Sequence, residues 1–594
     1  MRVADYIIKR LVESGIRHTF MVTGRGVLYL SDAVAADERM QSISTHHEQS
    51  AAYAAYAYGE YTGNLGACMV STGCASTNAI TGVMCAWQDD VPMIVISGQN
   101  MLKETTHYTH AKIRTYGQQE NDIIAQVKPI TKYAVMLEKA EDIGAVMDRA
   151  LYEATHGRKG PVWVDVPLDL QAMRVEEEKL RHFIPKKQSE RDLSIDEIVK
   201  QMRMAKRPVV LIGAGVRKSN ALEELYSFLK LSEIPVVYDA SAVDIYTDEN
   251  KNSIGAVGSM SGTRAGNFAI QNADLVFAVG CRLSTMLTGT ERQKFAREAA
   301  FIVIDVDEHE LKEHRFRDML TVHTEPKSVL VALLDRESEL KKDRRKWLEK
   351  CSHWKEIFPK NIYKGQKMTG KLDMYEVAEA IGKNADPDAV AITDAGIEEL
   401  VFPATMCLKG AARFIHPVSQ GAMGFAVPAV LGAYFASGKQ IICVVGDGSI
   451  MMNLQELQTI CSHNIPAKIF VINNNCYAVI RERQKELFRN RTIGTEPSNG
   501  VTVPEFKKVA DCFGFDYAMI SERKHLEQQV KDILALDRAM LCEVLCTEEQ
   551  KFLKNSYAMN KKHRILRRTL EDQSPFLDRE VIRAEMIVEP IEVE

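Results

Sequence analysis

The sequence predicts an α/β fold with three doubly wound domains, each built on a parallel sheet. Apolar runs of five or six residues alternate with helical stretches in three parts of the 594-residue chain. Short continuous apolar runs between helices are typical of parallel strands that are buried on both faces. A chain of this length is also too long for one hydrophobic core. We expect domains over residues 1–175, 190–335 and 370–550, followed by a tail over 551–594.

The expected elements follow one another in order. An amphipathic helix opens the chain, and the first domain then has strands near 66–71, 93–97 and 161–166. A charged linker over 174–206 precedes the second domain, whose strands are expected near 208–212, 273–280 and 301–305. Residues 336–356 are dense in Lys, Arg and Glu, which predicts a solvated connecting helix. The third domain has strands near 389–393, 440–445 and 468–472, and the tail is expected to be polar and irregular.

Composition and charge argue against several classes of protein. Apolar residues make up 46% and charged residues 26%, as in ordinary globular proteins. With 75 Lys and Arg against 80 Asp and Glu, the net charge of −5 does not indicate a nucleic-acid partner. No window approaches the roughly 18 apolar residues of a membrane span, and the amino terminus lacks the apolar core of a signal peptide. The 12 scattered cysteines form no metal-binding pattern, so we expect a cytoplasmic protein with reduced thiols.

The strongest local signal is a pair of motifs in the third domain. One strand ends in Gly446-Asp447-Gly448-Ser449, and the next strand ends in the asparagines at 473–475. One strand–helix–strand unit separates them, so both should emerge at the same carboxyl edge of the sheet. Glycines and a helix amino terminus suit a phosphate, and Asp and Asn oxygens suit Mg²⁺. The alternative is a plain turn in which Asp447 caps the helix.

At these motifs the chain resembles the thiamine-diphosphate (ThDP) enzymes along almost its whole length, in particular the acetolactate synthase large-subunit group. The resemblance implies pyrimidine-binding, central and diphosphate-binding domains, in this order. It implies that Mg²⁺ is held by Asp447, the side chain of Asn474 and the backbone carbonyl of Cys476. It further implies that the diphosphate is lined by Ala395, Gly396, Gly446, Gly448 and Ser449.

A second signature is Thr45-His-His-Glu48, a strand end that leads into an Ala/Tyr-rich helix. In the family this glutamate contacts N1′ of the aminopyrimidine. A buried carboxylate there stabilises the imino tautomer, whose nitrogen removes the C2 proton of the thiazolium. The resulting carbanion attacks a 2-oxo acid, CO₂ leaves, and the ring accepts the electron pair. The alternative is a surface acid at the start of a helix.

Three further segments match the family pattern. In the segment 417–425, the resemblance implies that the Gly421 carbonyl accepts a hydrogen bond from the 4′-amino group of ThDP. It also implies that Met423 lies under the two rings of the cofactor. Without the motif, Met423 would be an ordinary core residue. In 71–78, Cys74 and Asn78 belong to the turn that faces the pyrimidine, and Gln119 matches the glutamine that faces the reacting carbonyl. The family builds each site from two subunits, which implies a homodimer or homotetramer.

A possible flavin site is predicted in the central domain. Gly213-Ala-Gly215 is an incomplete dinucleotide motif, because Lys218 replaces its third glycine. The family resemblance adds Arg158, Arg282 and Asp305, which match positions that contact FAD in acetolactate synthases. Ser284 and Thr285 replace the family's paired aspartates. We expect FAD with a structural role, because decarboxylation and ligation require no net redox chemistry.

Several departures from the family concern the substrate. Arg483 replaces a tryptophan of the acceptor pocket, and Met286 replaces an arginine that orients the acceptor's carboxylate. Arg25 interrupts a Gly-Gly turn, Gln118 replaces a phenylalanine, and Ile397-Glu398 replaces a Gln-His pair. Arg25 and Arg483 are either solvated surface residues or part of a wider cationic pocket. The second interpretation suits a larger anionic acceptor such as a keto-sugar nucleotide.

The resulting hypothesis is a ThDP- and Mg²⁺-dependent carboligase that decarboxylates pyruvate and passes the hydroxyethyl unit to a second carbonyl. The first alternative is a 2-oxo-acid decarboxylase that releases an aldehyde, since such enzymes commonly carry a His-His pair like His46-His47. The second is a catalytically inactive scaffold, against which the intact Glu48 argues.

Overall fold

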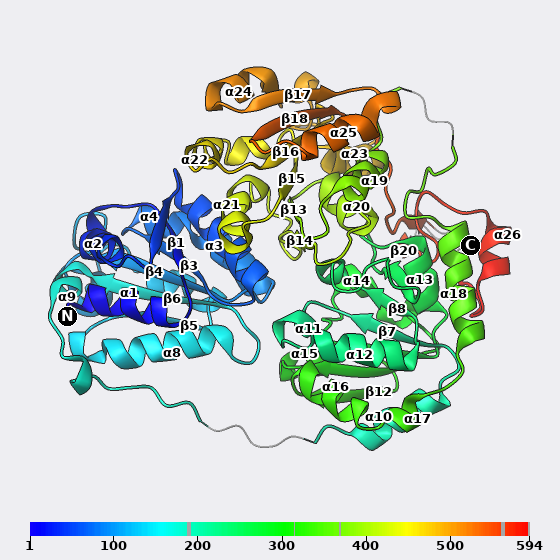
Figure 1. Ribbon diagram of the computed structural model, residues 1–594, viewed down its shortest axis with the longest axis horizontal. Helices are drawn as coiled ribbons and strands as arrows, with labels where there is room; N and C mark the ends of the chain where they lie inside the picture. The colour runs from blue at the N-terminus through cyan, green and yellow to red at the C-terminus, as the bar shows by residue number, and fades with distance from the viewer. Residues whose placement is uncertain (187–191, 314, 367–369, 560–564, 592–594) are drawn as a thin grey trace.

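The computed structural model describes residues 1–186, 192–313, 315–366, 370–559 and 565–591 (Figure 1). Three sheets of six parallel strands organise this part of the chain. Figure 1 shows them as three lobes, with the first domain in blue and cyan, the central domain in green, and the third in yellow and orange. The predicted class, three parallel-sheet α/β domains, is confirmed.

The first sheet has the strand order β2-β1-β3-β4-β6-β5. Its strands are β1 (His18–Met21), β2 (Gln41–Ser44), β3 (Gly66–Val70), β4 (Met93–Gln99), β5 (Tyr133–Met136) and β6 (Pro161–Pro167). The main helices are α1 (Val3–Glu13), α2 (Leu28–Ala36), α3 (Glu48–Thr62), α4 (Cys74–Asn78), α5 (Ile80–Gln88) and α8 (Ile143–Thr155). Helix α1 buries Val3, Ile7 and Leu11 on one face, as its amphipathic pattern predicts.

The third sheet repeats this topology, because its order is β14-β13-β15-β16-β18-β17. Its strands are β13 (Val390–Thr393), β14 (Arg413–Ile415), β15 (Ile441–Gly446), β16 (Lys468–Asn473), β17 (Asp516–Ile520) and β18 (Met540–Leu545). Its helices are α19 (Met374–Asn384), α20 (Ile397–Thr405), α21 (Ala426–Ser437), α22 (Glu456–Ser462), α23 (Ala478–Leu487), α24 (Phe506–Phe513) and α25 (Leu526–Leu534).

The central sheet differs, with the order β12-β11-β10-β7-β8-β9. Its strands are β7 (Pro208–Ile212), β8 (Val236–Tyr238), β9 (Ser253–Ala256), β10 (Leu275–Val279), β11 (Ala300–Asp305) and β12 (Met319–His323). Its helices include α10 (Ile195–Met204), α11 (Gly215–Lys218), α12 (Leu222–Ser232), α13 (Arg264–Gln271), α14 (Thr285–Thr288), α15 (Glu308–Glu313) and α16 (Pro326–Leu334). The earliest strand lies in the middle and the chain winds outward in both directions, which is the strand order of dinucleotide-binding domains.

The expectation of a solvated connecting helix over 336–356 is wrong. Helix α18 (Arg345–Ile357) lies against the central domain and buries Trp347, Cys351 and Trp354. The Trp354 and Phe268 ring centroids are 5.9 Å apart, and the Trp347 indole N–H donates to the Pro208 carbonyl over 2.8 Å. The charged side chains cover only the outer face of this helix.

The tail is ordered around the central domain rather than irregular. It contains the antiparallel pair β19 (Tyr557–Met559) and β20 (Ile565–Arg567) and helix α26 (Arg579–Glu585), drawn in red beside α18 in Figure 1. Gln573 accepts from the Asn267 side chain over 2.8 Å, and Glu571 forms a 3.0 Å ion pair with Arg297. Polar contacts therefore fix the tail to the central domain.

The first and third domains meet along helices α3 and α21. A Cβ added at Gly432 of α21 would overlap the carbonyl oxygen of Ala54 in α3, so the two backbones approach more closely than a side chain allows. Phe425, just before α21, lies edge-on to Tyr53 and Tyr56, with ring centroids 5.2 and 5.0 Å apart. This contact fixes α3, and with it Glu48, relative to the third sheet.

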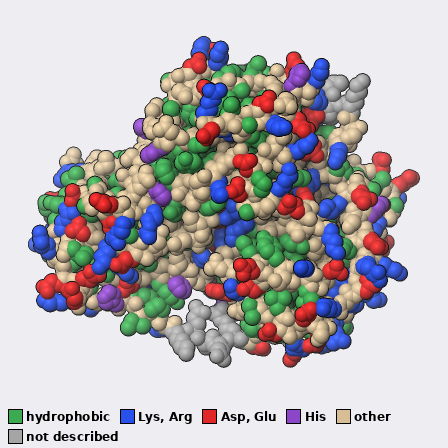
Figure 2. Space-filling model, in the orientation of Figure 1, with side chains coloured by type: hydrophobic (Ala, Val, Ile, Leu, Met, Phe, Trp, Pro, Cys, Tyr) green, Lys and Arg blue, Asp and Glu red, His purple; other side chains and the backbone are tan. Residues whose placement is uncertain are grey.

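The surface carries no strong bias of charge on the face seen in Figure 2, where acidic and basic side chains are interspersed. Among the described helices, none is both long and apolar enough to cross a lipid bilayer.

Candidate active site

The two predicted motifs of the third domain lie side by side at the carboxyl edge of its sheet. Strands β15 and β16 are neighbours, with Gly446 opposite Ile472. The Asp447 amide donates to the Ile472 carbonyl over 3.1 Å, and the Asn475 amide donates to Asp447 Oδ2 over 2.6 Å. Helix α22 connects the strands. The strand–helix–strand arrangement predicted from the spacing is present.

Asp447 is a buried carboxylate in surroundings that favour a cation. Its side chain is 3% exposed, and burial raises its pKa to about 6. Asn474 is also buried, and its Oδ1 accepts from the Cys476 amide over 3.2 Å. The described residues contain no cluster of three His, Cys, Asp or Glu side chains that would bind a metal by themselves. A metal here would take amide and carbonyl oxygens beside Asp447, a ligand set that suits Mg²⁺.

A second acid lies in the glycine-lined part of this edge. The carboxylate of Glu398 occupies the space that a side chain at Gly396 would need, and it also lies close to Gly446. Glu398 is 4% exposed, and burial with Asp447 and Asp394 nearby raises its pKa to about 8. The sequence shows the replacement of a Gln-His pair at this position, but only the fold shows that the acid points toward Gly396 and Gly446.

The predicted pyrimidine residues come together in the first domain. Glu48 is the first residue of α3 and is half-buried, and the Asn78 amide group donates to its Oε2 over 2.9 Å. Cys74 begins α4 and is exposed. Gln119 is also exposed and has a positive φ of 62°; the Thr72 hydroxyl lies 3.4 Å from its carbonyl oxygen.

The loop that carries Gly421 and Met423 is tied to both domains. The Gly424 amide donates to Ser449 Oγ over 2.9 Å. The buried Asn453 side chain donates to the Gly424 carbonyl over 2.8 Å and to Gln49 Oε1 over 3.0 Å. Asn453 therefore links this loop to the start of α3. Sequence reasoning missed Asn453, because it belongs to no motif and its partners are distant in the chain.

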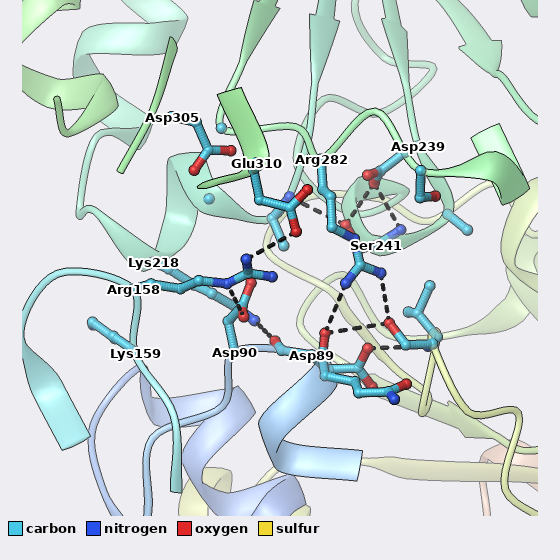
Figure 3. A pocket seen from close by; sticks show the side chains of 18 of the residues that line it. Asp89, Asp90, Arg158, Lys159, Lys218, Asp239, Ser241, Arg282, Asp305 and Glu310 are labelled. Atoms are coloured by element: carbon cyan, nitrogen blue, oxygen red, sulfur yellow. Dashed lines mark hydrogen bonds and ion pairs between the residues drawn. The ribbon is translucent and has the colours of Figure 1, made fainter. Parts of the chain in front are cut away.

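The predicted flavin residues surround a cavity of about 320 Å³ where the three domains meet (Figure 3). Four of the five line it, namely Arg158, Gly215, Arg282 and Asp305. The fifth, Gly213, packs its backbone against Gly280 beside the wall. The cavity thus brings together residues that follow β7 and β10 and the last residue of β11, at the carboxyl edge of the central sheet.

Polar contacts hold the two arginines of this cavity in place, and those of Arg158 are acidic. Figure 3 shows Arg158 reaching toward Asp90 and Glu310, at 2.7 and 2.9 Å. Arg282 donates to Ser419 Oγ over 2.9 Å. Burial raises the pKa of Asp305 to about 6. A partly buried carboxyl group of this kind suits hydroxyl groups of a ligand.

The two substrate candidates lie in different places. Arg483 lies on α23 and, together with Met286, lines a second cavity of about 190 Å³. Arg25 is exposed in the first domain, where its Nη1 donates to Gln118 Oε1 over 3.0 Å. Arg25 is not part of the wall of the second cavity.

Comparison with known proteins decides the family. The models for the N-terminal, central and C-terminal domains of thiamine pyrophosphate enzymes match residues 1–125, 195–333 and 394–544. An acetolactate synthase large subunit from Cyanidium caldarium is 31% identical over 91% of this chain and 93% of its own length.

The chain belongs to the thiamine pyrophosphate enzymes.

Other relatives of this enzyme carry the same name. A probable acetolactate synthase large subunit from Methanocaldococcus jannaschii is 31% identical over 92% of each chain, and one from Haemophilus influenzae is 28% identical over 91% of this chain and 93% of its own. This thiamine pyrophosphate enzyme is therefore a ThDP-dependent, acyl-transferring enzyme of the acetolactate synthase type. The matched domains contain Glu48, Arg282 and Asp447, whereas residues beyond 544 lie outside them.

Proposed function

We propose that this enzyme decarboxylates pyruvate and transfers the hydroxyethyl unit to a second carbonyl compound. The observation that carries the proposal is the pair of Glu48 and Asn78 at the start of α3, joined over 2.9 Å in a domain of the thiamine pyrophosphate enzyme family. A scaffold would not need a carboxylate oriented in this way.

Each proposed role follows from a side chain's surroundings. When bound, ThDP supplies the carbon nucleophile and the electron sink. Glu48 holds a proton at the pyrimidine ring, with Asn78 fixing one of its oxygens so that the other faces the ring. Asp447, the Asn474 side chain and the Cys476 carbonyl hold Mg²⁺. Gln119, exposed on the surface of the single chain, contacts the substrate carbonyl.

The diphosphate and ring contacts complete the assignment. Ala395, Gly396, Gly446, Gly448 and Ser449 form the diphosphate side, while Gly421, Met423, Cys74 and Asn78 contact the rings. The position of Ser449, which accepts from Gly424, supports a common site for the diphosphate loop and the Met423 loop.

We propose that the working enzyme is at least a homodimer. Cys74 and Gln119 are exposed and Glu48 is only half-buried in one chain, which leaves the pyrimidine residues open for a second copy to cover. Mixed dimers of Glu48→Gln and Asp447→Asn chains test this. Each variant alone is inactive, and the mixture regains activity if every site uses Glu48 of one subunit and Asp447 of the other. No recovery would indicate that each chain builds its own site.

The first cavity supports bound FAD with a structural role. The central sheet has the dinucleotide-binding strand order, and Asp305, Arg158 and Arg282 all line the cavity at its carboxyl edge. Purified enzyme should be yellow and show flavin absorbance. A colourless preparation that takes up no FAD on reconstitution would exclude this cofactor.

The second cavity and the basic Arg483 in its wall support an acceptor that is larger than pyruvate and anionic, such as a keto-sugar nucleotide.

The free thiols of the twelve cysteines support a cytoplasmic location of the enzyme. The aldehyde-releasing alternative has less support, because the His47 Nδ1 accepts from the Gln49 amide over 3.1 Å and thereby caps α3.

Product analysis tests the reaction itself. Carbon-labelled pyruvate is incubated with the holoenzyme, ThDP and Mg²⁺, and products are followed by NMR. Acetolactate without a further acceptor would establish ligation. Acetaldehyde alone, unchanged when keto-sugar nucleotides are added, would support the decarboxylase. If no CO₂ is released, pyruvate is not the donor.

A further inference from the structure

The second cavity is built from three parts of the chain. The central domain contributes α14 and the segment to Lys294, the third domain contributes Arg483 of α23, and the tail contributes Asn555, Ser556 and residues 567–570. The family models end at residue 544, so the tail wall is not part of the domains that define the family. One wall of the cavity therefore comes from a segment that the family models do not cover.

Basic side chains dominate the wall of the cavity. Lys294, Arg483, Arg567 and Arg568 line it, and Glu291 is the one acidic residue among the described residues of its wall. Its polar wall residues also include the hydroxyl groups of Ser259, Thr285, Thr288 and Thr290. Carboxylates compensate part of this charge, because Glu291, Asp572 and Glu486 lie 2.6, 2.6 and 3.9 Å from Lys294, Arg568 and Arg483. An anion bound between the four cations is attracted by all of them. Guanidinium groups pair particularly well with phosphate oxygens, because two N–H groups match two oxygens.

Three of these cations are held in position by the fold. Lys294 Nζ contacts Glu291 Oε2 over 2.6 Å and donates to the Arg567 carbonyl over 2.9 Å. Arg568 Nη1 contacts the buried Asp572 over 2.6 Å, and Arg567 donates to the Thr290 hydroxyl. The tail and the central domain are thus joined at the cavity itself, and their cations are oriented before any ligand arrives.

The cavity is connected to the proposed reaction centre through one helix. Helix α23 begins at Ala478, directly after the proposed metal ligands Asn474 and Cys476. Arg483 follows five residues later, which is about 7.5 Å along a helix axis. A ligand held at Arg483 by its anionic group therefore lies beside the diphosphate edge of the third sheet.

We propose that this cavity binds the phosphate groups of a phosphorylated carbonyl acceptor. The inference rests on the proposed carboligase function and specifies the substrate class of that reaction. Lys294, Arg483, Arg567 and Arg568 hold the phosphate oxygens, and the acceptor's carbonyl end extends toward the reaction centre. Specificity for the acceptor then depends on the tail as much as on the catalytic domains.

Calorimetric titration of the holoenzyme, saturated with ThDP and Mg²⁺, with methylenediphosphonate tests the inference. The cofactor fills the diphosphate edge, so the probe reports on the remaining anion sites. Arg567→Gln and Lys294→Gln should each weaken binding at least tenfold. Arg489→Gln removes the same charge from an exposed position outside the cavity and should leave binding unchanged. Having two variants from different walls keeps the test valid if one of them fails to fold.

Two results would overturn the inference. One is wild-type holoenzyme that does not bind the probe. The other is binding that Lys218→Gln weakens while Arg567→Gln does not, because the probe then occupies the first cavity. The titration needs no turnover, so it is independent of the proposed function. Absence of CO₂ release from pyruvate would reject the donor assignment and leave the phosphate site standing on its binding data.

Discussion

The Asn78 side chain donates a hydrogen bond to Oε2 of Glu48 over 2.9 Å, from the last turn of one short helix to the first residue of another. The bond fixes one oxygen of the carboxylate to which we assign the activation of the cofactor. It also gives Asn78 a positioning role that can be separated from the role of Glu48 itself.

Asn78→Ala should reduce the rate of CO₂ release from the 2-oxo acid about tenfold to a hundredfold, because a hydrogen bond to an ionised group contributes about 1.5–3 kcal/mol. Glu48→Gln should abolish turnover while calorimetry still detects bound ThDP. Thr77→Ala, on the same helix, is the matched control. A rate for Asn78→Ala within twofold of the wild type would show that Glu48 is held by other contacts.

At about pH 9, Glu398→Gln should strengthen ThDP binding, because it removes an ionised carboxylate that faces the proposed diphosphate side of the site. We expect the dissociation constant measured by calorimetry to fall about tenfold, or about 1.4 kcal/mol. The pKa of Glu398 is raised to about 8. The acid is therefore mostly neutral below that value, and wild-type affinity should decline as the pH rises from about 7 to about 9.

In the Glu398→Gln variant this decline should be much smaller. Equal slopes of affinity against pH in the two proteins would mean that Glu398 does not contact the diphosphate.

Asp394→Asn should make thermal stability less dependent on pH. Asp394 is fully buried, its Oδ1 has no hydrogen-bond partner, and burial raises its pKa from 3.8 to about 7. Because the folded state binds the proton more tightly, the stabilising contribution is complete below about pH 4 and is lost as the pH rises through about 7. Asn cannot titrate.

The wild-type Tm should therefore fall between about pH 4 and about pH 7 by at least about 2 °C more than the Tm of Asp394→Asn. The exposed Asp386→Asn serves as control. Parallel curves of Tm against pH would contradict the assignment of this titration to Asp394.

Gly432→Ala should destabilise the contact between the first and third domains. The added methyl group overlaps the Ala54 carbonyl oxygen, and overpacking of this kind costs about 1–3 kcal/mol. A scanning calorimeter should record a Tm lower by about 2 °C or more. Ser437→Ala, one turn further along α21, should have little effect. An unchanged Tm in Gly432→Ala would mean that α3 and α21 can move apart without loss of stability.

The elements whose apolar residues recur with a regular period were predictable from the sequence. The strand ends at Gly446 and Asn473 follow from two apolar runs and the turn residues after them, and the structure places them side by side. The burial of one face of α18 could also have been predicted from the sequence. Trp347, Cys351 and Trp354 recur at helical spacing, but the density of charge around them hid the narrow apolar stripe.

Other features depend on contacts that a sequence pattern does not encode. The tail is held by polar pairs such as Gln573 with Asn267, which are 306 residues apart, and by the burial of Leu570, Ile582, Met586 and Val588. The direction of Glu398 depends on the backbone around Gly396, and the role of Asn453 depends on partners in two domains. Long-range polar contacts leave no periodic signal, so only the folded chain reveals them.

Thr285 and Met286 line both cavities, so a helix of four residues is the partition between them. A change of side chain at either position reshapes two binding spaces at once. Selection for a new acceptor on one side of the partition is therefore constrained by whatever occupies the other side. An engineer who wishes to widen the acceptor space has more freedom in the tail, where Asn555 and Thr569 face the second cavity alone.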